Sequence, residues 1–115
     1  MKKDNAVYLH HILDAIEQIE SYTAGLSREE FLDRRMVQDA VVRQLEIIGE
    51  ASRQLPDDVC ARYDHVPWTE MIGLRNRIAH EYLDIDLHVI WEIVTHDLPT
   101  LKRTVSSLLD READG

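Results

Sequence analysis

The sequence holds a single cysteine, Cys60, and no apolar run near the length of a membrane span. One thiol cannot form a disulfide within the chain or supply the several thiolates of a structural metal site. The N-terminus also lacks the charged, apolar and small-residue order of a secretory signal. These absences argue against a disulfide scaffold, a membrane protein and a secreted protein, and we expect a cytoplasmic location.

Glycine and proline are scarce as well, with four and three residues among 115. The chain is 44% hydrophobic and 30% charged, a composition typical of ordered, helix-rich proteins. A chain of this length buries roughly two thirds of its unfolded surface, which is enough for one modest core. We therefore expect residues 1–115 to form a single domain.

Basic residues are the minority charge, with 13 Lys and Arg against 22 Asp and Glu and a net charge of −9. The chain as a whole therefore gains nothing from general attraction to phosphate. Eight of the 13 basic residues nevertheless fall between Arg28 and Arg77. Any nucleic-acid role must be local, and an acidic domain without a polyanionic partner stays open.

Apolar residues that recur every three and four positions predict four or five helices. The first ends at Gly25. The second begins with Ser27 as N-cap and Glu30 as its reciprocal partner, and a helix over 28–55 would be roughly 42 Å long. Its apolar arc is wider than one neighbour needs, so a second partner is implied, either another helix of the chain or the same helix of a second subunit.

The second half of the chain is also expected to be helical. A short helix is predicted over 57–63, and the next begins at Pro67. The last helix starts after Asp84 or Asp86, and Pro99 inside it should cause a kink, since proline removes one hydrogen bond and crowds the preceding turn. The fold class that follows is all-α, an antiparallel up-and-down bundle of four to five helices.

One group of possible metal ligands recurs every four residues: His88, Glu92 and His96. This spacing lines them up on one helix face, as a zinc site requires. The face points away from the apolar stripe, however, and no second layer of hydrogen-bonding groups supports it. A second cluster, formed by His10, His11 and Asp14, is weaker still. We interpret both as solvated surfaces and expect no metal and no cofactor.

The segment "GLRNRIAHEYLDID" differs, because it sets polar side chains among apolar neighbours. They are Arg75, Asn76, Arg77, His80 and Tyr82. On a helix Arg75 is wedged between apolar groups, so the fold must place a carboxylate or a bound phosphate opposite its guanidinium. A purely structural interpretation also fits, with Arg75 in an ion pair, His80 bonded at the helix end and Tyr82 in the core.

The directions of these side chains pose a problem for a shared site. In a continuous helix His80 points about 140° away from Arg75, because each residue advances 100°. The two can converge only if the helix ends near His80 or if two copies face each other. Tyr82, about 20° from Arg75 in the same projection, should open onto the same cleft, unless it is a packed aromatic residue.

The pattern "RNRIAHEY" resembles the signature of HEPN-domain proteins, specifically the HepT-like toxins encoded beside a minimal nucleotidyltransferase antitoxin. The resemblance covers nearly the whole chain. Three segments carry it in the family's order: "QDAVVRQLEIIGEASRQLP" (38–56), "VPWTEMIGLRNRIAHEYLDID" (66–86) and "DLPTLK" (97–102).

The resemblance implies a helical homodimer in which two copies of Arg75 and His80 meet in a cleft and cleave RNA without metal. The chain would be the toxin of a toxin–antitoxin pair of type II or VII. Its cognate nucleotidyltransferase antitoxin would join AMP to Tyr82. Family members also act as non-catalytic substrate-binding or scaffold subunits of that nucleotidyltransferase, and this alternative stays open.

The residue types suit this chemistry. Metal-free RNA cleavage uses the 2′-OH as nucleophile, and histidine is the side chain suited to remove its proton near neutral pH. A guanidinium such as that of Arg75 stabilises the extra negative charge of the phosphorane. Asn76 could orient His80 or donate to a phosphate, and Arg77 could bind the flanking backbone. Nothing in the sequence indicates which RNA is cut.

Overall fold

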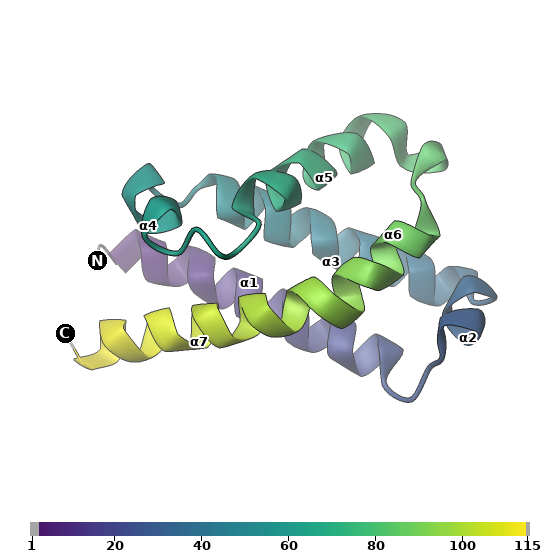
Figure 1. The fold of residues 1–115 in the computed structure, drawn as a ribbon, viewed down its shortest axis with the longest axis horizontal. Helices are drawn as coiled ribbons and strands as arrows, with labels where there is room; N and C mark the ends of the chain where they lie inside the picture. Colours follow the sequence, from purple (N-terminus) through teal and green to yellow (C-terminus); the bar gives the residue numbers. More distant parts are fainter. Residues whose placement is uncertain (1–2, 115) are drawn as a thin grey trace.

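A computed structural model describes residues 3–114, and every regular element in that range is helical. The elements are α1 (Lys3–Thr23), α2 (Arg28–Leu32), α3 (Arg35–Arg53), α4 (Asp57–Arg62), α5 (Trp68–Glu81), η1 (Tyr82–Asp84), α6 (Leu87–Glu92), η2 (Ile93–Asp97) and α7 (Leu98–Asp114). Consecutive rods α1, α3, α5 and α6–α7 alternate in direction (Figure 1). The predicted all-α, up-and-down bundle is confirmed. Within residues 3–114 no helix combines the length and apolarity that crossing a membrane requires.

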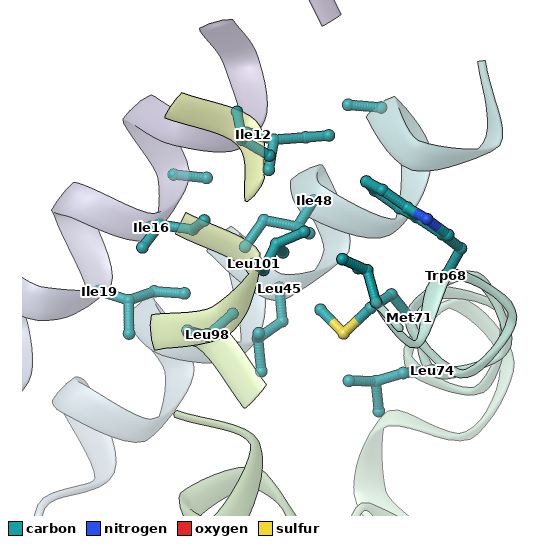
Figure 2. Packing of buried hydrophobic residues seen from close by; sticks show 14 of the residues in the cluster. Ile12, Ile16, Ile19, Leu45, Ile48, Trp68, Met71, Leu74, Leu98 and Leu101 are labelled. Carbon is teal, nitrogen blue, oxygen red and sulfur yellow. The ribbon is translucent and has the colours of Figure 1, made fainter. Parts of the chain in front are cut away.

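One continuous core lies between the four rods. Helix α1 packs against α3 and α7, and α3 packs against α5. Figure 2 shows the side chains that meet there: Ile12, Ile16, Ile19, Leu45, Ile48, Trp68, Met71, Leu74, Leu98 and Leu101. Because α3 has α1 on one side and α5 on the other, most of its apolar arc is covered within one chain, although Met36 at its start is 88% exposed. The sequence left two possible partners for this arc, another helix of the same chain or the same helix of a second subunit. In the structure α3 packs against helices of its own chain.

The predicted start of the second helix is confirmed. Ser27 Oγ accepts the Glu30 N–H at 3.1 Å, and Glu30 Oε1 accepts the Ser27 N–H at 3.0 Å, which is a complete capping box. The same hydrogen bond from the Ser27 backbone is the main cause that lowers the pKa of Glu30. The end of the first helix is confirmed too, since Gly25 follows α1 with a φ of 75°.

The single helix predicted over 28–55 is wrong, because the chain breaks between α2 and α3 at Asp33 and Arg34. The side-chain amide of Gln38 donates to the carbonyl oxygens at the end of α2, at 2.9 and 3.0 Å, and so replaces helical partners. Phe31 is fully buried, and the centroid of its ring lies 5.1 Å from the centroid of the Trp91 ring. These contacts with α3 and α6 hold α2 across the end of the bundle and make the break favourable.

The last rod confirms one of the two caps that the sequence offered for its start. Asp86 caps α6, with its carboxylate accepting the His88 N–H at 2.9 Å. Two residues before Pro99 the rod contains the end of the π-helical turn η2 (Ile93–Asp97). Proline has no N–H to donate, and a wider turn in the preceding segment accommodates that loss.

Gly49 determines how closely α3 and α5 approach. A Cβ atom at this position would lie 2.4 Å from Arg75 Cβ and 2.7 Å from the Met71 carbonyl oxygen. Neither can move without shifting α5. Gly49 is therefore the residue that lets Arg75 pack directly on α3.

We expect Gly49→Ala to lower the free energy of unfolding by about 1–3 kcal/mol, as overpacking of a tight contact does. Urea denaturation followed by circular dichroism measures this. Gly73→Ala on α5 is the matched control, since a Cβ there meets nothing within 4 Å. That substitution should stabilise the helix by about 0.5–1 kcal/mol. Equal stability of the two variants would contradict the close approach at Gly49.

Candidate active site

Arg75 lies on the side of α5 that faces α3. Its Nε atom is 3.2 Å from Glu50 Oε2, and 27% of its side chain is exposed. The buried Nε and Oε2 atoms form an ion pair without the alignment of a hydrogen bond. The guanidinium also donates from Nη1 to Asn76 Oδ1 at 3.3 Å. The carboxylate that the sequence required opposite Arg75 is thus supplied by Glu50.

Glu50 is held as an anion by more than one cation. The hydrogen bond from Arg53, at 2.9 Å, is the largest cause that lowers its pKa, and the charges of Arg53 and Arg75 add to it. The carboxylate therefore has a second partner on its own helix. Arg75 is held by a carboxylate that stays charged, which fixes the guanidinium near the surface of the bundle.

Arg75 lines a groove of about 390 Å³ between α1, α3 and α5, which we call the Arg75 groove. Its other lining residues are Tyr8, His11, Arg43, Glu46, Ile47, Glu50, Ala51 and Gln54. A second guanidinium, an imidazole and a phenol thus face the same hollow as the predicted catalytic arginine. A substrate phosphate that reaches Arg75 from this side has to enter the groove.

His80 does not share the groove with Arg75. It is exposed in the last turn of α5, which stays α-helical to Glu81. The two side chains therefore diverge by about 140° in projection, and the end of the helix comes too late to turn His80 back. The two side chains could converge if the helix ended near His80 or if two copies faced each other. The helix of a single chain does not end early enough for the first arrangement. Asn76 and Arg77 are exposed beside them.

The expectation that Tyr82 opens onto the cleft of Arg75 is wrong for a single chain. It assumed a continuous helix, but the backbone leaves α-helical geometry at Glu81, with φ −136° and ψ 41°, and Tyr82 begins η1. The Tyr82 hydroxyl donates to Asp39 on α3, and this bond is the main cause that raises the pKa of the phenol. Tyr82 is exposed rather than packed in the core.

Tyr82 borders a second, smaller hollow of about 150 Å³, which we call the Tyr82 pocket. It lies between the start of α3 and the segment from η1 to α6. The charged lining residues are Arg35 and Asp39, and the rest are Gln38, Val42, Leu83, Ile85 and Leu87. One chain thus presents the Tyr82 phenol and the Arg75 guanidinium in separate hollows.

On the helix face of His88, Glu92 and His96, which resembled a metal site, the central carboxylate of Glu92 has other partners. Glu92 pairs with Arg28 of α2, and the other carboxylate oxygen lies 3.1 Å from His96 Nε2. Across the described part of the chain, no three His, Cys, Asp or Glu side chains are grouped closely enough to hold a metal ion.

Sequence reasoning missed Gly49, Glu50 and Asp39 as parts of these sites. One signal was available for the first two. An isolated glycine beside a carboxylate, inside an otherwise apolar helical arc, indicates a close helix contact with a charged partner. No comparable signal marks Asp39, since its bond to Tyr82 joins residues 43 positions apart.

Comparison with known proteins identifies the family of this chain. The family described as ribonuclease HepT-like matches residues 12–108. The "Probable ribonuclease HepT" of Thermococcus cleftensis is 42% identical over 102 residues, which cover 89% of this chain and 93% of that protein. A "Putative RNase" of Methanocaldococcus jannaschii is 40% identical, with 90% and 95% covered. No solved structure gives a significant match.

A second protein of Methanocaldococcus jannaschii is named as a gamma-glutamylcyclotransferase and putative RNase. It is 40% identical over 110 residues, which cover 96% of this chain. The chain spans only 50% of that longer relative. Matches of this extent, over all the rods of the bundle and the segment that carries Arg75 and His80, are the evidence for its family. The chain belongs to the HepT-like ribonuclease family.

Proposed function

We propose that the chain is a metal-independent endoribonuclease, the toxin of a toxin–antitoxin pair, whose active site forms between two copies. The observation that carries this proposal is the divergence of Arg75 and His80 on one rigid helix. Glu50 holds the guanidinium on one side of α5, while His80 is exposed on another. A two-fold axis brings Arg75 of one subunit to His80 of the other, which a single chain cannot do.

The chemistry divides between the two residues. His80 takes the proton of a ribose 2′-OH, and the 2′ oxygen attacks the neighbouring phosphorus. Arg75 stabilises the negative charge that builds on the phosphorane oxygens. The bond to the 5′ oxygen then breaks, and that oxygen leaves with a proton from solvent, which produces a 2′,3′-cyclic phosphate. Asn76 and Arg77, exposed on the same helix, bind the flanking backbone.

The first test is RNA cleavage by purified protein that has been freed of partners and treated with EDTA. We expect cuts that leave cyclic-phosphate ends, identified by mass spectrometry of the fragments. The alternative, a non-catalytic substrate-binding or scaffold subunit of a nucleotidyltransferase, predicts intact RNA under every condition. Cleavage that stops with EDTA and returns with Mg²⁺ would also contradict the proposal.

The partner is the cognate nucleotidyltransferase, which we propose joins AMP to Tyr82. In this reaction the Tyr82 oxygen attacks the α-phosphate of ATP, pyrophosphate leaves, and Asp39 accepts the phenolic proton through its existing hydrogen bond. Tyr82 follows the C-terminal end of α5, so the added adenylate would stand at the end of the helix that carries His80. RNA then meets a steric block and like-charge repulsion at the His80 end of α5.

Tyr82→Phe is expected to stay folded and to cut RNA but to escape neutralisation by the nucleotidyltransferase, since it lacks the acceptor oxygen. Intact-mass spectra of the co-expressed proteins measure the added adenylate. Tyr22→Phe, a half-buried tyrosine of α1 outside both hollows, is the control and should be modified like the wild type. Wild-type protein that is silenced without any added mass would point to inhibition by complex formation alone.

A further inference from the structure

The Arg75 groove contains an aromatic corner that the proposed chemistry does not use. The Tyr8 and His11 rings, one turn apart on α1, have centroids 6.3 Å apart and planes inclined at 80°. A flat ring that stacks on one of them therefore meets the other edge-on. Ile47 and Ala51 of α3 add apolar surface to the same hollow.

The groove also contains a cation that can be released. Arg43 Nη1 lies 2.7 Å from Glu46 Oε1 on the same helix, and 67% of the Arg43 side chain is exposed. Exposed pairs of this kind contribute little to stability, because solvent screens them. Arg43 can therefore exchange its contact with Glu46 for a phosphate at low cost. Arg75, by contrast, is fixed by Glu50.

Aromatic rings beside an arginine are the features with which proteins bind single-stranded RNA. Bases stack on aromatic side chains, and guanidinium groups bind the phosphates between them. The volume of about 390 Å³ lies within the range of small-molecule sites, roughly 300–1,000 Å³. Glu46 and Glu50 in the walls disfavour a duplex, whose second backbone would bring further negative charge to the groove.

We propose that the Arg75 groove is a subsite for one nucleotide of single-stranded RNA, next to the phosphate held by Arg75. The base stacks on Tyr8 against the edge formed with His11, and the phosphate of that nucleotide contacts Arg43. This inference rests on the proposed function for its substrate, but it assigns residues of α1 and α3 that lie outside the "RNRIAHEY" segment. It also gives the acidic chain a local contact for a polyanion.

The test uses a fluorescent RNA oligonucleotide in which every 2′-OH is methylated, so that it binds but cannot be cut. We expect Tyr8→Leu, which keeps the apolar volume, to weaken binding by about 5- to 150-fold, the usual loss for one stacked base. Tyr8→Phe should recover most of that affinity. Arg43→Ala should also weaken binding, while Arg62→Ala, at an exposed i,i+4 pair outside the groove, should not.

Cleavage of unmodified RNA, measured in parallel, separates the two proposals. If the wild type binds and Tyr8→Leu weakens binding, but nothing is cut, the subsite stands and the nuclease proposal fails. If RNA is cut while Tyr8→Leu and Arg43→Ala bind like the wild type, the subsite is overturned and the nuclease stands. Thermal melts by circular dichroism identify any variant whose weaker binding reflects unfolding. If Tyr8→Leu is unfolded, the affinity of Tyr8→Phe, which keeps the ring, is the measurement that tests the subsite.

Discussion

Replacing His80 with alanine should slow RNA cleavage by about 10²- to 10⁴-fold, the usual contribution of a positioned general base. The imidazole is the group proposed to remove the 2′-OH proton, and no other histidine lies on α5. His80 is exposed, so its loss should leave the core and the helical circular dichroism unchanged. Single-turnover cleavage of a labelled oligonucleotide measures the rate.

His88→Ala is the control for this prediction. His88 is also exposed and is the second residue of the neighbouring helix α6, but it lies outside the Arg75 groove and the Tyr82 pocket. The His88→Ala protein should cleave RNA at the wild-type rate. An active His80→Ala protein would exclude His80 as the base and leave the imidazole of His11, in the Arg75 groove, as the residue to test.

Arg75→Ala is expected to slow cleavage by about 10²- to 10³-fold, the loss typical of removing one preorganised donor to a developing charge. Arg75→Lys should restore little of this. An ammonium is a point charge that lacks the planar fork which contacts two phosphorane oxygens at once. The rate is measured in the same single-turnover assay.

The fold should tolerate the loss of Arg75. Its removal leaves the Glu50 carboxylate partly buried, but Arg53 still donates to that carboxylate at 2.9 Å. Urea denaturation checks that Arg75→Ala is folded under assay conditions, and Arg62→Ala serves as the charge-matched control. Full activity of Arg75→Lys would contradict the role of the planar guanidinium and reduce Arg75 to a general positive charge.

The parts of the fold that follow from local signals were predicted well. Gly25 and the Ser27–Glu30 capping box mark helix ends through contacts within four residues, and the structure has both ends. The break at Asp33 depends instead on Gln38 reaching back to α2 and on Phe31 packing against Trp91, 60 positions away in the sequence. Such contacts decide between a long helix and a broken one, and the spacing of apolar residues along the sequence does not reveal them.

The candidate site shows the same division. The need for an anion opposite Arg75 followed from the cost of burying a guanidinium, and Glu50 meets it. Which residue supplies that anion did not follow from the sequence, because the answer depends on how α3 crosses α5 at Gly49. The direction of Tyr82 was wrong for a related reason: a projection along an ideal helix cannot include the change of backbone at Glu81.

The central claim is that Arg75 and His80 act together only across two subunits. Heterodimers of Arg75→Ala and His80→Ala chains, purified through two different tags, test it most directly. Each such dimer keeps one site in which both residues are intact, so cleavage should return to about half the wild-type rate per dimer if the site is shared across a two-fold axis. A heterodimer no more active than either variant alone, or a wild-type protein that light scattering shows to be an active monomer, would contradict the claim.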